Sequence, residues 1–314
     1  MPEVVTLGET MAVMAPAEPG PLRYVHEYRL KMAGAESNLA VGLCKLGHSA
    51  GWISRLGEDE MGYYLLGAIR GEGVDTGNVQ MDAQHRTGLM LKQTGSGETK
   101  VFYYRENSAA SCLSPEDLQE EYLAGASILY LTGITPALSE SCEQAARKMA
   151  DYAAKSGIPL GFDPNIRKKL WTGRDFRPLL RELLFSSRIA LLGLDEAEEL
   201  LGSREPQAIA ALLREKGAAF IAIKDGGHGA WVADRQRLLK IEPFPCRTVD
   251  SIGAGDAFNA GFLSGILEGR DLKSCGRMGA IAGAMATETL GDIESYPSRS
   301  QLQLRLEEKP ELFR

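Results

Sequence analysis

The alternation of short apolar segments with longer helical segments is the feature that most constrains how this chain can fold. After Pro115, buried-strand patterns occur at 128–131, 159–163, 189–192 and 220–224. Helical patterns follow them at 139–155, 175–184, 195–202 and 206–216. Such alternation predicts a parallel sheet that is covered by helices on both faces.

The two ends of the chain extend the same pattern. Val4 to Gly8 is an apolar, β-branched run that predicts a buried strand, and strand patterns also occur near 229–232 and 238–241. The chain then continues with helical stretches at 254–268 and 271–288. No internal repeat or linker divides the sequence. We therefore expect residues 1–314 to form one doubly wound, mostly parallel α/β domain.

Two segments do not fit this alternation. Residues 10–33 are irregular and proline-rich, whereas residues 87–105 resemble a β-hairpin around the turn cluster Thr94-Gly95-Ser96-Gly97. These segments predict a small β-sheet lid made from two insertions, at about 10–33 and 86–107. Because exposed lid strands can pair with a second copy, we expect a homodimer or a higher homo-oligomer.

Composition and charge exclude several classes of protein. The formal net charge is −7, which argues against a nucleic-acid partner, since phosphate binding needs a basic face. No apolar run approaches the ~18 residues that span a bilayer, so no membrane partner is expected. The five cysteines form no CxxC pair, and no basic residue precedes Arg23, so we expect reduced thiols and a cytoplasmic location.

The strongest chemical motif is the stretch DSIGAGDAF from Asp250 to Phe258. A glycine-rich turn there opens a helix, and the free N–H groups of Gly253, Ala254 and Gly255 make an anion site. Asp256 lies in the first helical turn, where the helix dipole favours its ionised form, as a base for a phosphoryl acceptor requires. An ordinary capped helix with closely packed glycines explains the same residues, and the motif alone does not choose between the two.

A second glycine-rich stretch, KDGGHG, runs from Lys224 to Gly229 after a predicted strand. Open α/β sheets bind ligands at the carboxyl ends of their strands, so this turn is a candidate nucleotide site. An ordinary tight turn is the alternative. The pattern GxxxxGK[ST] is absent, and Phe258 replaces the third glycine of GxGxxG, which excludes a P-loop and a typical dinucleotide site.

Two arginines lie in distinctive surroundings. Arg105 ends the run FYYR, and Arg167 ends the run DPNIR. Arginine suits bidentate binding of a carboxylate, although a single arginine is more commonly a solvated surface charge. The four histidines have no metal-ligand spacing, and the HExxH motif is absent, so no histidine is expected to hold a metal.

These motifs together resemble the PfkB, or ribokinase-like, sugar kinases over essentially the whole chain. MAGAESNLA at 32–40 is similar to the amino-terminal signature of the family, and RLGED follows at 55–59. DSIGAGD at 250–256 is similar to the carboxyl-terminal signature, with Ser251 in the place of a threonine. The resemblance implies a ribokinase-like fold with a β lid.

Within the family, the chain resembles the 2-keto-3-deoxygluconate kinases. The resemblance rests on GETM at 8–11, YYR at 103–105, TGITPAL at 132–138 and DPNIR at 163–167. It implies ATP-dependent phosphorylation of 2-keto-3-deoxygluconate to the 6-phosphate by in-line transfer. The alternatives are a kinase of a neutral sugar (fructokinase- or ribokinase-like) or of a nucleoside, and a non-catalytic sugar-acid sensor.

The resemblance also implies roles for individual residues. ATP and Mg²⁺ are the expected cofactors, together with K⁺ near the anion site in many members. Asp256 is the expected base, and Gly253, Ala254 and Gly255 bind the transferring phosphate. The expected substrate-binding residues are Gly34, Tyr103, Arg105, Asn165 and Arg167. The expected nucleotide residues are Lys224, Gly226, Gly227 and Gly229, and Glu196 is the expected metal residue.

The chain departs from the family pattern at four places. Ala33 replaces the first glycine of a frequent Gly-Gly pair, and Gly193 replaces the asparagine of an Asn-x-x-Glu motif. Ala280 replaces an asparagine near the adenine, and Met90 replaces a lid tyrosine of some relatives. None of these changes removes the expected base or anion site, so an active enzyme is expected.

Overall fold

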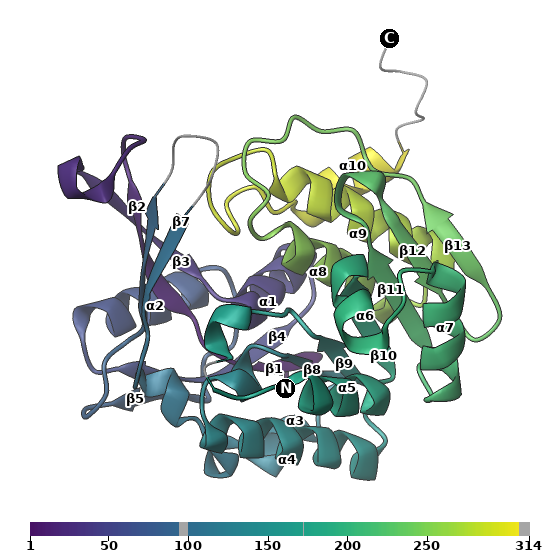
Figure 1. Cartoon of the computed structure of the whole chain (residues 1–314), viewed down its shortest axis with the longest axis horizontal. Coiled ribbons are helices and arrows are strands. Elements are labelled where there is room, and N and C mark those ends of the chain that lie inside the picture. Colours follow the sequence, from purple (N-terminus) through teal and green to yellow (C-terminus); the bar gives the residue numbers. More distant parts are fainter. Residues whose placement is uncertain (94–99, 172, 308–314) are drawn as a thin grey trace.

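A nine-stranded sheet forms the centre of the protein, for which a computed structural model describes residues 1–93, 100–171 and 173–307 (Figure 1). The strands, in chain order, are β1 Val4–Leu7, β4 Ala50–Gly57, β5 Val79–Asp82, β8 Ile128–Thr132, β9 Leu160–Asp163, β10 Ile189–Gly193, β11 Phe220–Lys224, β12 Ala230–Ala233 and β13 Leu238–Ile241. Their spatial order is β13-β12-β11-β10-β9-β8-β1-β4-β5. All pairings from β11 to β5 are parallel, and β12 and β13 add an antiparallel edge.

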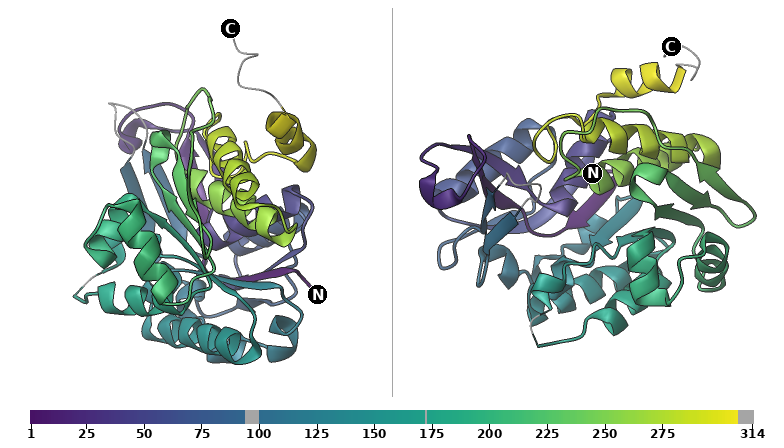
Figure 2. Two further views of the ribbon diagram at one scale, coloured as in Figure 1. Left: turned by 90° about the vertical axis from the view of Figure 1, so that its right-hand side faces the viewer. Right: turned by 45° about the horizontal axis from the view of Figure 1, so that its top comes forward.

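Helices cover both faces of this sheet, as Figure 2 shows from two directions. One face carries α4 Glu140–Ser156, α5 Arg177–Ser186, α6 Leu194–Leu201 and α7 Pro206–Glu215. The other carries α1 Ala35–Lys45, α2 Glu60–Gly71, α8 Ala254–Leu267 and α9 Leu272–Ala286. The remaining helices are α3 Glu120–Leu123 and α10 Arg299–Glu307.

The strands divide their side chains between the two cores. In β8, Leu129 and Leu131 pack against the α4–α7 layer, whereas Ile128 and Tyr130 pack against the α1, α8 and α9 layer. All four are buried, which is the reason that the strand reads as a continuous apolar run rather than as an alternating one. The predicted fold class, a mostly parallel sheet with helices on both faces, is confirmed.

Four strands form a separate small sheet, which we call the lid: β2 Met11–Pro16, β3 Tyr28–Ala33, β6 Leu89–Gln93 and β7 Lys100–Tyr104. The order is β3-β2-β6-β7, with β2 and β6 parallel and the other two pairings antiparallel. Three residues separate the carboxyl end of β1 from lid strand β2, and the chain returns from β3 to the body at the start of α1. It therefore lies next to the carboxyl edge of the large sheet (Figure 1).

The sequence predictions place most elements within a few residues of these bounds. Asp59 caps α2, since its side chain accepts a 2.8 Å hydrogen bond from the N–H of Gly62. The turn at 94–97 predicted within the hairpin of β6 and β7 lies outside the described residues. Strand β5 and the helices α3 and α10 were not expected. Over the described part of the chain, no helix has the length and apolar character needed to cross a bilayer.

Candidate active site

The carboxyl edge of the large sheet gathers buried polar side chains from distant parts of the sequence. Asp163 ends β9, Lys224 ends β11, and Asp256 lies in the first turn of α8. The Nζ of Lys224 donates to Oδ2 of Asp163 at 2.6 Å, and these side chains are only 16% and 3% exposed. A polar cluster at this edge is the usual place for a ligand site in an open α/β sheet.

Gly253 shapes the turn that precedes α8. Its φ is +79°, a left-handed conformation that glycine adopts without strain. A Cβ at this position would lie 2.2 Å from the carbonyl oxygen of Asp292. The carbonyl of Gly253 itself accepts a 2.8 Å hydrogen bond from the hydroxyl of Tyr296. The glycine turn (residues 250–255) therefore has a fixed shape, which leaves the first N–H groups of α8 at its opening.

Asp256 is buried next to Asn38 of α1. The Nδ2 of Asn38 donates to Oδ2 of Asp256 at 2.9 Å. Burial raises the pKa of Asp256 to about 7, the nearby Asp163 adds to the rise, and Asn38, Lys224 and Arg167 oppose it. The expectation that Asp256 stays ionised at the start of the helix is not met at neutral pH, because burial penalises the charged form. A pKa near neutrality is suited to a general base.

Asn259 of α8 links the buried groups behind Asp256. Its Nδ2 donates to Oδ2 of Asp163 at 2.6 Å and to the hydroxyl of Tyr130 at 3.1 Å, while its Oδ1 lies 3.3 Å from the Nζ of Lys224. Burial alone would lower the pKa of Lys224, but the charges of Asp163 and Glu196 outweigh this effect and raise it. Lys224 is therefore a permanent cation in the floor of the site.

Glu196 lies beside this floor, in the first turn of α6. Its Oε2 accepts the N–H of Gly193 at 2.7 Å, and its Oε1 accepts the N–H of Ile166 at 2.8 Å. Burial and the charge of Asp163 raise the pKa of Glu196, and Lys224 opposes the rise. Gly193 has ordinary extended backbone, so no conformational reason requires glycine where the family pattern has asparagine.

The charges around this floor fit a divalent cation. The carboxylates of Asp163, Glu196 and Asp256 lie close together around the ammonium group of Lys224. The charge of Asp163 raises the pKa of the other two carboxyl groups. The cluster therefore carries an excess of negative charge, and oxygen ligands are those that Mg²⁺ prefers. Burial is the main cause of the raised pKa values of Glu196 and Asp256, and the nearby charge of Asp163 adds to both.

Three cationic side chains lie around Tyr103 and Asp256. Arg105 and Lys169 lie over the ring of Tyr103, at 5.7 Å and 5.9 Å from its centroid. Lys169 belongs to the short helix Lys168–Leu170, which directly follows Arg167. The positive charge of Arg167 lowers the pKa of Asp256. Tyr103, Arg167 and Lys169 are exposed, so this cationic rim is open to a ligand.

Arg105 has a partner that sequence reasoning did not find. Its Nη2 forms an ion pair with Oε2 of Glu9, whose side chain is fully buried. Oε1 of Glu9 accepts a 2.6 Å hydrogen bond from Ser108. The Nε of Arg105 is buried and makes no hydrogen bond within the described residues. Arg105 therefore neutralises a buried carboxylate of the protein in addition to any ligand that it binds.

The predicted glycines divide into two groups. A Cβ at Gly34 would lie 2.5 Å from the Glu9 carbonyl, and one at Gly229 would lie 2.1 Å from the Ile241 carbonyl, so both glycines are required by the packing of the protein itself. Gly226 and Gly227 are exposed, and nothing lies within 4 Å of a Cβ at either position. The space that a ligand could use in the predicted nucleotide site is therefore beside Gly226 and Gly227.

Asn165 lies in the turn after β9 and holds an unusual backbone conformation. Its φ is +37°, and its N–H donates to Oδ1 of Asp163 at 3.1 Å. Asparagine tolerates this left-handed region better than most residues. The residue is buried, and it fixes the direction in which the chain continues towards Arg167 and Lys169.

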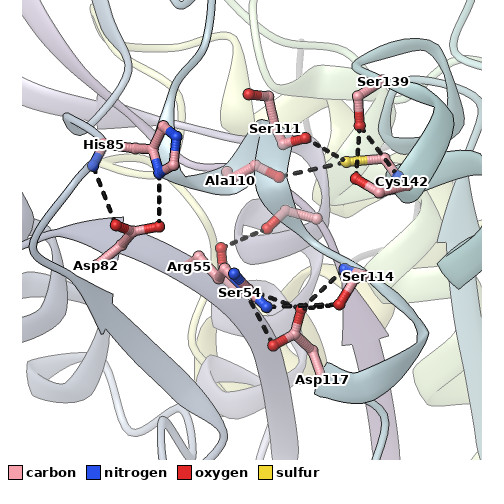
Figure 3. A network of polar contacts seen from close by, with 12 residues as sticks. Ser54, Arg55, Asp82, His85, Ala110, Ser111, Ser114, Asp117, Ser139 and Cys142 are labelled. Carbon is pink, nitrogen blue, oxygen red and sulfur yellow. Dashed lines mark hydrogen bonds and ion pairs between the residues drawn. The ribbon is translucent and has the colours of Figure 1, made fainter.

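A second polar network joins side chains between Ser54 and Cys142 (Figure 3). Among the described residues, Asp82, His85 and Cys112 form a group whose potential metal-ligand atoms all lie within 4.8 Å of one another. The carboxylate of Asp82, however, already accepts the N–H groups of Gln84 and His85 and lies 3.0 Å from Nδ1 of His85. These contacts explain the group as the end of a turn, without a metal.

The comparisons with known proteins agree with one another. The family description "pfkB family carbohydrate kinase" matches residues 1–299. The chain is 36% identical to a 2-dehydro-3-deoxygluconokinase from Bacillus subtilis over 96% of this chain and 94% of the relative. It is 32% identical to a 2-dehydro-3-deoxygalactonokinase from Haloferax volcanii over 93% of this chain and 92% of the relative.

A solved structure supports the fold independently. An Escherichia coli protein described as a ribokinase II in complex with ATP and Mg²⁺ has a TM-score of 0.91 over 98% of this chain and 99% of that one. The two sequences are 23% identical, so this likeness concerns the fold alone.

Proposed function

The chain belongs to the pfkB family of carbohydrate kinases, and on that premise we propose that it phosphorylates a 2-keto-3-deoxy sugar acid with ATP. The substrate that we favour is 2-keto-3-deoxygluconate, and the product is its 6-phosphate. The terminal hydroxyl oxygen attacks the γ-phosphorus, the new O–P bond forms as the bond to the ADP oxygen breaks, and the hydroxyl proton passes to Asp256.

One observation carries the choice of a sugar acid over a neutral sugar. Arg167 and Lys169 are two positions apart in the chain. Arg167 favours the ionised form of Asp256, and Lys169 lies over the ring of Tyr103 in the lid. A substrate whose hydroxyl reaches Asp256 would present its other end to these cations. A carboxylate at that end would gain charge-assisted hydrogen bonds that a neutral hexose or a nucleoside lacks.

The phosphate-binding roles follow from the same geometry. The first N–H groups of α8, which follow Gly253, would bind the transferring phosphoryl group. Lys224 lies close to them, since its Nζ would be 3.9 Å from a Cβ placed at Gly255. The nucleotide would lie beside Gly226 and Gly227. Mg²⁺, when bound, supplies charge that neutralises the phosphate oxygens, and Glu196 is the residue that would hold it.

A coupled assay for ADP release tests the proposal. Purified protein would receive ATP and Mg²⁺ with 2-keto-3-deoxygluconate, 2-keto-3-deoxygalactonate, fructose, ribose or adenosine as parallel acceptors. Turnover that is confined to the sugar acids is the expected result, and the ratio of kcat/KM for the two epimers identifies the preferred one. Strong turnover of fructose or adenosine would contradict the role of the cationic rim. Absence of turnover with every acceptor would favour the alternative of a non-catalytic sugar-acid sensor.

A further inference from the structure

Lys92, on lid strand β6, makes a buried ion pair with the first residue of the glycine turn. Its Nζ lies 2.5 Å from Oδ2 of Asp250, and the two side chains are 8% and 10% exposed. The two residues are 158 positions apart in the sequence. The contact therefore exists only when the lid lies against the body of the protein.

The position of Lys92 in its strand is unusual for a lysine. Alternation along β6 places Lys92 on the same face as Met90. Met90 belongs to the small apolar core of the lid, with Met11, Val13 and Ala33. A buried ammonium group costs free energy unless it is paired, and the carboxylate of Asp250 supplies that pairing. The lysine is thus directed inward, towards the site, and not into solvent.

Asp250 connects this charge to the shape of the glycine turn. Its Oδ1 accepts the N–H of Ile252 at 3.2 Å, and its own N–H donates to the carbonyl of Thr287 at 3.1 Å. Ile252 directly precedes Gly253. An uncompensated charge on Asp250 would therefore act on the segment that orients the first N–H groups of α8.

Besides Asp250, the charge of Lys92 acts on the buried carboxylate of Asp292. Burial raises the pKa of Asp292 to about 6, and among its neighbours Lys92 lowers it whereas Glu294 and Asp250 raise it. Asn38 joins Asp292 to Asp256, since its Nδ2 also lies 3.2 Å from Oδ2 of Asp292. The positive charge of Lys92 thus offsets the charges of Asp250 and Asp292, which lie before and beside Gly253.

We propose that Lys92 is a positioning residue which supplies, from the lid, the monovalent positive charge beside the anion site. The resemblance to the family implied K⁺ near this turn, and here an ammonium group of the chain itself neutralises Asp250. Two consequences follow: the enzyme works without K⁺, and the glycine turn takes its active shape when the lid is docked. The inference rests on the phosphate-binding role proposed above for residues 253–255.

The test compares Lys92→Met with Lys92→Arg and with the wild type, using the best acceptor found in the assay described above. In choline buffer without K⁺ or NH₄⁺, the wild type is expected to be fully active. Lys92→Met should lose kcat by about 10- to 100-fold with little change in the KM for ATP. Addition of K⁺ or NH₄⁺, which are close to each other in size, should restore part of that kcat. Lys92→Arg should keep most activity and show no cation dependence.

Lys31→Met is the matched control. Lys31 is also a lid lysine, and its Nζ lies 2.7 Å from Oε1 of Glu294 and donates to the carbonyl of Leu290. The Lys31→Met variant removes this ion pair between the lid and the body and leaves the Lys92–Asp250 pair in place. Its kcat should show no dependence on K⁺ or NH₄⁺.

Three results would overturn the proposal. These are a wild type that requires K⁺, a Lys92→Met variant with unchanged kcat, and a variant whose loss neither cation restores. Thermal denaturation gives a readout without turnover: K⁺ should raise the Tm of Lys92→Met but not that of the wild type. If no acceptor is phosphorylated, the proposed function fails, whereas this difference in Tm still decides whether Lys92 replaces a cation. Should Lys92→Met not fold, Lys92→Gln takes its place in both measurements.

Discussion

Asn38 of α1 donates a 2.9 Å hydrogen bond to Oδ2 of Asp256 of α8, across a separation of 218 residues in the sequence. The bond stabilises the ionised carboxylate, whereas burial destabilises it more, so the pKa of Asp256 lies at about 7. The expected base is therefore half protonated near neutral pH. Four predictions below depend on this balance or on the groups that set it, which include Lys224 and Arg167.

The rate should depend on pH through Asp256. We expect kcat/KM for the sugar acid, at saturating MgATP, to rise with pH and to level off above about pH 7, because only the ionised carboxylate accepts the proton. Asn38→Ala should move the midpoint to higher pH, since it removes a hydrogen bond that favours the ionised form. A profile that is flat from acid to alkaline pH would contradict Asp256 as the base.

Asp256→Asn should lose activity and gain stability. We expect kcat to fall by about 10²-fold or more with little change in either KM. The pKa of a free aspartate is about 3.9, well below the folded value, so stability is lost as pH rises between the two and the loss is complete above about pH 7. An asparagine at position 256 does not ionise, so the variant does not lose stability in this pH range.

Thermal or urea denaturation at pH 8 checks the second half of this prediction. The variant should be more stable than the wild type by roughly 1 to 3 kcal/mol, because Asn38 can still donate to the new side chain. At a pH below about 4 the two proteins should differ little. A variant that is less stable than the wild type at pH 8 would show that burial does not penalise the charge of Asp256.

Lys224→Met should destabilise the fold as well as slow the reaction. The change leaves the buried carboxylate of Asp163 without its ammonium partner, and such a loss costs about 3–5 kcal/mol. The double variant Lys224→Met with Asp163→Asn should recover much of the stability, since it removes the unpaired charge. Urea denaturation of the four proteins of this cycle measures the coupling, and independent effects of the two changes would refute it.

Arg167→Ala should raise the KM for the sugar acid by about tenfold or more and leave the KM for ATP nearly unchanged. Arg105→Ala should raise the same KM but also lower the Tm, because it leaves the buried Glu9 unpaired. Arg270→Ala removes an equal charge just beyond the far end of α8 and should change neither KM. If Arg167→Ala and Arg105→Ala both keep the wild-type KM for the sugar acid, the proposed role of the cationic rim is wrong.

Gly253→Ala and Gly227→Ala should have opposite effects. At Gly253 the φ is +79°, and a Cβ would lie only 2.2 Å from the Asp292 carbonyl. Gly253→Ala should therefore lower the free energy of unfolding by about 3 kcal/mol or more and be inactive. At Gly227 nothing lies within 4 Å of the new Cβ, so stability should be unchanged. A higher KM for ATP in Gly227→Ala would support a nucleotide at that turn, and an unchanged value would place the nucleotide elsewhere.

The order of the main elements was predictable from the sequence because its signals are local. β8 and β9 are buried on both faces and therefore read as apolar runs. β5, Val79–Asp82, escaped prediction because it is a four-residue edge strand whose only two apolar side chains, Val79 and Met81, are partly buried. α10 escaped because only one of its side chains, Leu302, is buried.

The sequence by itself determined the glycine turn, the helix that follows it and the position of Asp256 in the first turn of that helix. These features are local, because a turn that requires glycine is encoded within a few residues. The tertiary structure decided which charges meet. The pairs Asn38–Asp256, Lys224–Asp163, Arg105–Glu9 and Lys92–Asp250 each join segments that are 61 or more residues apart. Local pattern carries no information on such pairs, because the burial that shifts a pKa or demands a partner arises only when the sheet, the helices and the lid pack together.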